Sequence, residues 1–231
     1  MLPPRALDTI YLAFSAKYLT ALVRILKTLS RETQPKAYST LIQIFALLPE
    51  PKVNPYVRQV LRSERAAGLP NLVVQAYLAG VELRRPAGPG HFCTLMINLF
   101  FWCDVEMGDD QRASVDKDAR AALVTRLQAF QGTNEYAALD RYQSIEVDRL
   151  IGMLGAVENM PTGPMPVGYY LISTRQHLEG SVTGQRECDV CVDEDAGLLC
   201  SKCKSVRYCG KECQARAWKD GHKYKCFALV D

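Results

Sequence analysis

The chain has 231 residues, of which 48% are hydrophobic and 23% are charged, and its formal net charge is +3. This composition excludes a fibrous or disordered protein and is typical of one ordinary globular domain with a smaller one beside it. A net charge this small does not by itself indicate a nucleic-acid partner.

Residues 1–155 are predicted to form a helical domain. The first stretch, from residue 5 to about residue 29, keeps apolar side chains at helical spacing over several turns. Breaks rich in Pro and Gly separate further expected helices over roughly 36–49, 54–67, 70–84, 91–106, 111–130 and 135–153. Asp110 and Asn134 are predicted as the N-caps of the last two. No alternating run is long enough for a convincing strand.

Three apolar octads in this part resemble one another, at 41–48, 72–79 and 95–102, and each contains one amide residue. Such echoes are typical of stacked helical repeats of the armadillo or HEAT type. Their intervals differ and no repeat consensus can be written. A compact bundle and a short helical stack therefore both stay open.

The N-terminus predicts no secretory signal, because prolines occupy the n-region and Asp8 and Lys17 interrupt the apolar stretch. The longest apolar run, 92–103, is too short to span a bilayer and is interpreted as a buried helix. We therefore expect an intracellular protein, in the nucleus or cytoplasm, with no membrane partner. In such a compartment nine cysteines favour metal binding over disulfides.

The composition changes after residue 155. Residues 156–186 are rich in Pro and Gly and then polar, which predicts a linker with a short helix around 167–178. Seven of the nine cysteines follow within 188–226. The sequence thus predicts three parts: a helical domain (1–155), this linker, and a small finger (187–231).

The finger contains eight soft or borderline metal ligands at regular spacing. They are Cys188, Cys191, Cys200, Cys203, Cys209, Cys213, His222 and Cys226. Cys-x2-Cys pairs in a tight turn direct two sulfurs at one ion, whereas Cys-x3-Cys and His-x3-Cys place ligands on one face of a helix. Eight ligands suffice for two tetrahedral zinc ions, and about forty residues with few aliphatic side chains need metal to fold.

Two alternatives for these cysteines are much weaker. Ordinary buried cysteines explain a lone pair but not eight ligands at these spacings. A thioredoxin-like redox pair requires a strand–helix context that the pattern lacks. Spacing alone leaves open whether the two sites are sequential or interleaved.

The pattern resembles the MYND zinc finger over residues 188–226. The resemblance rests on the ligand spacing, on Arg207-Tyr208 before the fifth ligand, and on the positions of Gln214 and Trp218. It implies two interleaved sites, with one zinc ion held by Cys188, Cys191, Cys209 and Cys213. The second ion would be held by Cys200, Cys203, His222 and Cys226. The expected fold class is therefore mainly α: a helical bundle or short stack followed by a two-zinc α+β finger.

The same resemblance implies a binding function. MYND fingers bind short proline-containing peptides, commonly of a Pro-x-Leu-x-Pro kind, and the groove residues correspond here to Ser201, Gln214 and Trp218. An indole face packs well on a proline ring, and Ser and Gln can bond the backbone of an extended ligand. The simpler alternative is that Trp218 only covers the small core of the finger.

No catalytic residue is predicted. Structural zinc leaves no open coordination position, so the expected function is a non-enzymatic adaptor that links partner proteins, for example in transcription or protein turnover. The alternative is an enzyme with an unrecognised active site in the helical domain. A SET-type methyltransferase is disfavoured, because no Asn precedes a His and the strands of that fold are missing. A RING or PHD finger, and with it a ubiquitin-ligase function, is also disfavoured, because those fingers place the histidine at an earlier ligand position.

Nucleic acid is an unlikely partner on electrostatic grounds. Residues 186–231 carry nine Lys or Arg against eight Asp or Glu. Seven thiolates and two Zn²⁺ ions would add three negative charges, so the assembled finger would be weakly acidic. No pattern in the sequence indicates an oligomeric state.

Overall fold

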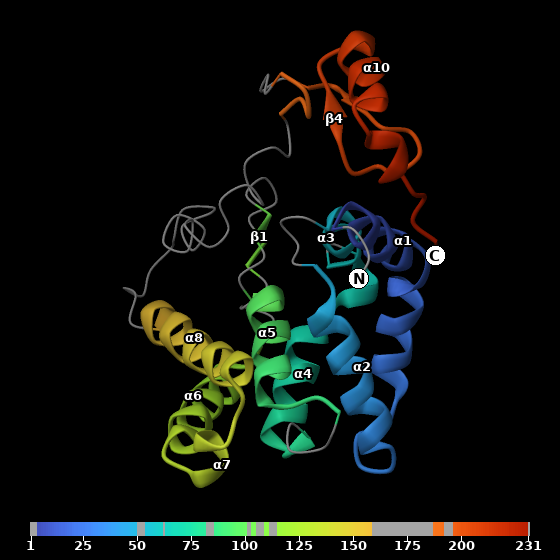
Figure 1. Ribbon diagram of the computed structural model, residues 1–231. Helices are drawn as coiled ribbons and strands as arrows, with labels where there is room; N and C mark the ends of the chain where they lie inside the picture. Colours follow the sequence, from blue (N-terminus) through green and yellow to red (C-terminus); the bar gives the residue numbers. More distant parts are fainter. Residues whose placement is uncertain are drawn as a thin grey trace. The chain divides into compact units, whose positions relative to one another are not determined.

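The structure is a computed structural model that describes residues 4–49, 54–61, 63–81, 86–100, 103–104, 109–110, 115–158, 187–191 and 196–230. It is mostly helical, with short strands and a Cys/His finger near the C-terminus (Figure 1). The linker predicted over 156–186, with its short helix, lies almost entirely outside the described residues. In chain order the elements are α1 (Pro4–Thr28), α2 (Pro35–Leu47), α3 (Pro55–Leu61), η1 (Glu64–Ala66), α4 (Leu69–Leu78), α5 (Pro89–Phe100), β1 (Cys103–Asp104), β2 (Asp109–Asp110), α6 (Lys117–Gln131), α7 (Asn134–Ala137), α8 (Arg141–Glu158), β3 (Leu198–Leu199), β4 (Arg207–Tyr208), α10 (Lys211–Lys219) and η4 (His222–Tyr224).

The chain divides into two compact units. The finger unit comprises Met1–Val23, Leu48–Arg65 and Leu178–Asp231, and the helical unit comprises Arg24–Leu47 and Ala66–His177. The boundaries of these units differ from those of the three parts predicted from the sequence. Helix α1 as far as Val23 and all of α3, which the sequence assigns to the helical domain, belong to the same unit as the zinc-finger segment.

Several predicted helices have different boundaries in the structure. The helix expected over 91–106 ends at Phe100, and Cys103–Asp104 form β1, which pairs antiparallel with β2. The helix expected over 54–67 is divided into α3 and η1, and the one expected over 135–153 is divided into α7 and α8. The expectation that residues 1–155 contain no strand was wrong for β1 and β2. Each of these strands has only two residues, which is too short to produce an alternating pattern.

Both predicted N-caps were wrong by position. Helix α6 begins after Asp116, whose carboxylate accepts a hydrogen bond from the Asp118 N–H at 3.2 Å. Asp110 lies earlier, in β2. Helix α7 is capped by Thr133, whose hydroxyl accepts from the Tyr136 N–H at 3.2 Å, and Asn134 is the first helical residue. In each case a neighbouring acceptor, placed where the chain enters the helix, satisfies the free N–H group.

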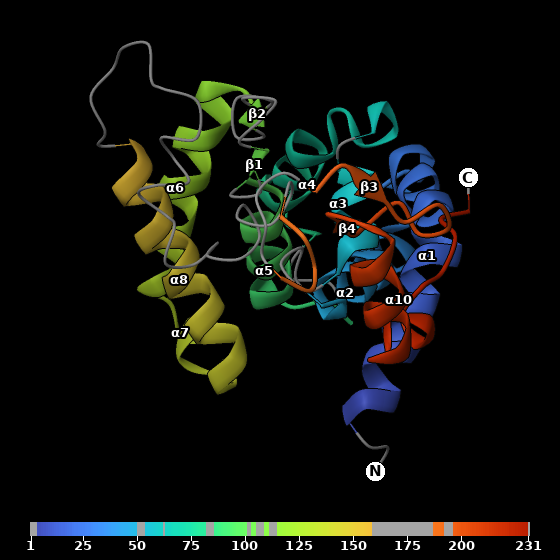
Figure 2. The same ribbon diagram turned by 90° about the horizontal axis from the view of Figure 1, so that it is seen from above.

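Helix α5 is the centre of the helical unit. It contacts α2, α4 and α8, and Phe92, Cys93 and Met96 are fully buried. Helices α6 and α8 also contact each other, and Figure 2 shows them side by side. Helix α5 contacts α2 and α8, which are not adjacent to it in chain order, as well as the preceding α4. In a linear stack each helix would contact only its neighbours along the chain, so the arrangement is a bundle.

Polar side chains join α5 to α8 inside this unit. The Gln143 side-chain oxygen accepts from the Gly90 N–H at 2.6 Å, and its amide nitrogen lies 2.7 Å from His91 Nδ1. The Thr94 hydroxyl donates to the Glu146 carboxylate at 3.0 Å. These bonds satisfy polar groups that the close approach of the two helices removes from water.

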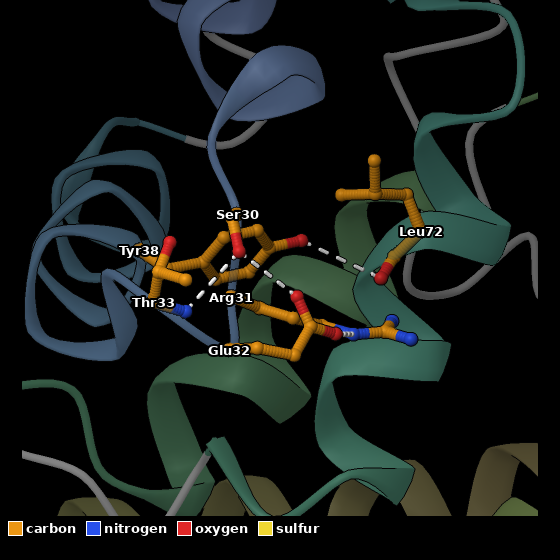
Figure 3. Close-up of polar contacts among 6 residues, drawn as sticks. All are labelled: Ser30, Arg31, Glu32, Thr33, Tyr38 and Leu72. Atoms are coloured by element: carbon orange, nitrogen blue, oxygen red, sulfur yellow. Dashed lines mark hydrogen bonds and ion pairs between the residues drawn. The ribbon is translucent and has the colours of Figure 1, made fainter.

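The turn between α1 and α2 is closed by local hydrogen bonds (Figure 3). The Ser30 hydroxyl accepts from the Thr33 N–H at 3.1 Å and donates to Glu32, which also pairs with Arg31 at 2.9 Å. A backbone hydrogen bond and then the Arg31 and Ser30 side chains lower the pKa of Glu32. The Tyr38 hydroxyl, from the first turns of α2, reaches the Leu72 carbonyl of α4 at 3.5 Å.

The finger unit has a small core made largely of cysteines and aromatic rings. The short sheet pairs Leu198 with Tyr208 and Leu199 with Arg207. Its buried residues are Leu12, Ala16, Tyr56, Cys188, Ala196, Cys200, Cys203, Tyr208, Ala217 and Cys226. The Val230 N–H donates to the Ala16 carbonyl at 2.8 Å, so α1 supplies both apolar surface and a backbone acceptor to this unit.

One described helix, over Ala6–Thr28, is long and apolar enough to cross a membrane, judged by length and composition alone. About 39% of the apolar window in this helix is buried within the protein. Leu12 and Ala16 on this helix belong to the core of the finger unit. Packing in the core accounts for these two residues, whereas Leu7, Ile10, Tyr18 and Ile25 of the same helix are exposed.

Candidate metal centre

The eight predicted ligands lie in two separate groups of four. Each residue offers one ligand atom, and the atoms of a group all lie within 4.8 Å of one another. The first group is Cys188, Cys191, Cys209 and Cys213. The second group is Cys200, Cys203, His222 and Cys226. These are the interleaved sets that the resemblance implies, and not the sequential ones that spacing also allowed.

The distances within the groups fit tetrahedral zinc. Zn–S bonds of about 2.3 Å in a tetrahedron place two sulfurs about 3.8 Å apart. In the first group Cys209 Sγ lies 3.5 Å from the Sγ atoms of both Cys191 and Cys213. In the second, Cys200 Sγ lies 3.6 Å from Cys226 Sγ, and Cys203 Sγ lies 3.7 Å from His222 Nε2. Four donors surround each centre, which leaves no position for an activated water.

Short loops and the small sheet bring the first group together. The Asp189 N–H donates to the Arg207 carbonyl at 2.9 Å and holds the loop of Cys188 and Cys191 against β4. Cys209 follows β4 directly, and Cys213 lies in the first turn of α10, four residues later. That spacing presents both sulfurs on the same side of the helix start.

The second group depends on a tight turn and on η4. The Cys200 N–H donates to the Val206 carbonyl, and the Lys204 N–H donates back to the Cys200 carbonyl, both at 3.0 Å. Lys204 has a left-handed backbone, with φ of 54°. Gly221, with φ of 124°, turns the chain into η4 so that His222 can reach the site. A side chain at position 221 would be strained in that conformation.

Backbone donors favour a thiolate in each group. Burial alone would raise the pKa of Cys188, but the N–H groups of Cys209, Cys191 and Val190 outweigh it and lower the pKa to about 6. Cys200 behaves in the same way. Burial is opposed there by the N–H groups of Cys203 and Lys202 and by the His222 side chain, and the resulting pKa is again about 6. Preformed thiolates are the form that zinc binds.

The other ligands hold protons more tightly. The hydrogen bond to Cys203 raises the pKa of His222 to about 9, although burial opposes the shift. Burial, followed by the hydrogen bond to Cys200, raises the pKa of Cys226 to about 12. Hydrogen bonds to neighbouring thiols raise the pKa of Cys209. Zinc binding must therefore displace protons from these groups, which makes metal affinity dependent on pH.

The three predicted peptide-binding residues lie on the finger surface. Gln214 and Trp218 are four residues apart on α10 and therefore share one side of that helix, with Gln214 half-buried and Trp218 45% exposed. Ser201 is exposed in the turn after β3. The ring of Trp218 also lies 6.0 Å from that of His222 in an edge-on arrangement. Trp218 thus covers a metal ligand and still leaves much of its surface open.

A groove of about 1090 Å³ in the finger unit is lined in part by Cys203 and His222 of the second ligand group and by Ala217 of α10. Its walls carry both signs of charge, with Asp8 and Asp189 as well as Arg216 and Lys225. Ser201, Gln214 and Trp218 do not line it. The three predicted residues thus lie outside the lining of this groove, but Ala217 and Lys219, on either side of Trp218 in the chain, belong to it.

Sequence reasoning missed the residues outside the finger that complete its unit. Tyr56 and Gln59, on α3, form hydrogen bonds with the segments that carry Cys203 and Cys226. Tyr56 is fully buried although its helix is only seven residues long. An aromatic residue in a short helix carries no local signal of a partner about 170 residues away. Only the folded chain brings these groups together.

Comparison with known proteins agrees with this geometry. Residues 188–226 match the family model of the MYND finger. Ubiquitin carboxyl-terminal hydrolase 19 of Arabidopsis thaliana is 51% identical over 45 residues, which are 20% of this chain and 6% of that protein. Protein-lysine N-methyltransferase SMYD4 of Danio rerio is 29% identical over 83 residues, which are 30% of this chain and 11% of that protein. Ubiquitin C-terminal hydrolase 15 of Oryza sativa subsp. japonica is 50% identical over 40 residues, which are 17% of this chain and 4% of that protein.

The chain thus covers only about a tenth or less of the length of these relatives. No solved structure matches. The protein carries a MYND zinc finger, which is a protein-interaction module, in a mainly helical chain.

Proposed function

We propose that the protein is a non-enzymatic adaptor whose MYND finger holds two structural zinc ions and binds short proline-containing segments of partner proteins. The observation that carries the proposal is the pair of closed four-ligand groups beside the open face of Trp218. Closed sites supply folding energy and no reactive position. The finger is then a scaffold that presents α10 to a ligand.

The chemistry of this surface supports an extended, proline-rich ligand. The exposed indole of Trp218 offers a flat apolar face, Gln214 offers a donor and an acceptor on the same side of α10, and Ser201 is an exposed hydroxyl on the same finger. Extended proline-containing peptides have free backbone carbonyl groups and rings that stack on such a face. We expect the proline ring to pack on the indole and the peptide backbone to bond with the two polar side chains.

The test is a calorimetric titration of the zinc-loaded 231-residue chain with a Pro-x-Leu-x-Pro peptide. Trp218→Ala removes the stacking surface, and we expect the dissociation constant to rise about thirtyfold, since a central aromatic contact is worth about 2 kcal/mol. Tyr224→Ala is the matched control, because Tyr224 is 62% exposed on the same finger but lies outside the predicted surface.

The control should bind the peptide as the wild type does. A peptide that binds equally well to Trp218→Ala would contradict the proposed surface. A chain that retains two zinc ions but binds no such peptide would leave the adaptor without this class of ligand and would overturn the proposal.

The absence of enzymatic activity and the intracellular location are part of the same proposal. The matched relatives include enzymes by name, but the shared segment covers a small fraction of each. Their activities are therefore not carried over to this chain. The polar cluster of Gln143, Thr94 and Glu146 in the helical unit is bonded internally, as a packing contact between helices. Cysteines that bind zinc suit a reducing compartment, where disulfides are rare.

A further inference from the structure

Through Tyr56, helix α3 contacts the segment that carries Cys226, a ligand of the second group. The Tyr56 hydroxyl accepts from the Phe227 N–H at 2.7 Å. It also lies 2.9 Å from the Lys225 carbonyl and 3.0 Å from that of Phe227, and its single proton can be donated to one of them at a time. These two residues flank the ligand Cys226. One buried hydroxyl therefore fixes the backbone on both sides of that cysteine.

The same helix contacts the other side of the group through Gln59. Its amide nitrogen donates to the Cys203 carbonyl at 2.7 Å and to the Ser205 hydroxyl at 2.5 Å. The Ser205 hydroxyl in turn donates to the Cys203 carbonyl at 2.8 Å. Gln59 and Tyr56 are three residues apart, so both extend from one face of α3.

Helix α3 is itself fixed at its N-terminus. The Asn54 side-chain oxygen accepts from the Tyr56 N–H at 3.2 Å, as an N-cap does. The amide nitrogen of Asn54 donates to the Ser15 hydroxyl of α1 at 2.8 Å, and both residues are fully buried. The Tyr56 ring also packs at 6.4 Å from that of Phe227. A short helix that is capped, anchored and buried can hold two distant segments at a fixed separation.

We propose that Tyr56 and Gln59 are positioning residues of the second zinc site, and that α3 sets the separation between Cys203 and Cys226. The inference rests on the proposed two-zinc finger. The first group has a different support, since the Asp189 N–H bonds to Arg207 within the finger itself. Loss of outer hydrogen bonds that orient ligands typically lowers metal affinity by about 10- to 100-fold. The two sites should therefore respond differently when α3 loses its polar contacts.

The experiment uses the zinc-loaded 231-residue chain and a chromogenic chelator that records the release of each ion over time. Tyr56→Phe removes the hydroxyl and keeps the buried ring, and Gln59→Met removes the amide at similar volume. We expect one of the two ions to leave about tenfold faster or more in either variant, and the other to leave at the wild-type rate. Zinc is then replaced by Co²⁺, whose visible absorption differs between the site with four cysteines and the site that includes the histidine. The band that disappears first shows which site loses its ion faster.

Tyr38→Phe is the matched control, because Tyr38 is equally buried and bonds to a backbone carbonyl in the helical unit. It should release both ions as the wild type does. Wild-type release of both ions in Tyr56→Phe and Gln59→Met would overturn the inference, as would equal acceleration of both. A wild-type chain that holds no zinc would refute the proposed function itself, whereas two retained ions with unaltered release would refute only the role of α3.

Discussion

Single residues in this protein are constrained by contacts that their type alone does not reveal. Gly90 begins a helix and has an ordinary backbone, yet a Cβ atom there would lie 2.5 Å from the Cα of Gln143. Real Cβ atoms do not approach a backbone atom so closely. The glycine is therefore required by the approach of α5 to α8, and not by a turn.

We predict that Gly90→Ala destabilises the protein by about 1–3 kcal/mol, because the added methyl group must push two packed helices apart. The measurement is the midpoint of urea unfolding, followed by circular dichroism. Gly152→Ala is the control, since a Cβ atom at position 152 meets nothing within 4 Å in α8. That substitution should be neutral or slightly stabilising, and equal effects of the two would contradict the close approach.

At the scale of an element, the ends of helices were the features that the sequence placed least well. Helix α6 shows why. The pattern offers several acidic residues before the helix, and each can act as an acceptor for a free N–H group. Asp116 is the cap because its backbone has a non-helical ψ of 135° and its carboxylate lies 3.2 Å from the Asp118 N–H. Which acidic residue reaches that geometry depends on the preceding chain path.

We predict that Asp116→Ala lowers the free energy of unfolding by about 1 kcal/mol, the usual cost of losing an N-cap. Asp110→Ala removes the residue that the sequence pattern favoured and should leave α6 unchanged, since Asp110 lies in β2. Hydrogen exchange of the first backbone amides of α6 shows which of the two aspartates is the N-cap. Faster exchange of these amides in Asp110→Ala, and not in Asp116→Ala, would contradict the assigned cap.

At the scale of the whole molecule, the stability of the finger unit is tied to metal and to pH. The pKa of Cys188 and of Cys200 is lowered from 9.0 to about 6. A lowered pKa stabilises the folded form above the unfolded value of 9.0. This contribution shrinks as the pH falls and is lost as the pH passes below about 6. Protons and zinc compete for the same sulfurs in this range.

We therefore predict that zinc is retained at pH 8 and that its binding weakens as the pH is lowered through about 6, where Cys188 and Cys200 take up protons. The measurement is zinc release to an indicator, followed in parallel with hydrogen exchange. Amides of the finger unit should lose protection together with the metal, and those of α5 and α8 in the helical unit should keep it. Retention of both ions well below pH 5, or loss of protection throughout the chain at once, would contradict this separation.

Much of the metal centre could be predicted from the sequence. Ligand identity and spacing are local properties, because Cys-x2-Cys turns and Cys-x3-Cys helices fix their own geometry over a few residues. Resemblance to the MYND finger added the interleaved grouping, which the structure reproduces. Most helices followed from the periodicity of apolar residues in the same local way, although their ends did not.

Only the tertiary structure decided how the finger is completed. Tyr56 and Gln59 are ordinary residues of a short helix, and their partners lie some 140 to 170 positions further along the chain. Likewise Gly90 is constrained by Gln143 and not by its neighbours. Spacing within a segment determines which atoms can share an ion. The packing of segments that are distant in sequence determines which backbone groups hold those atoms in place, and no local pattern encodes that pairing.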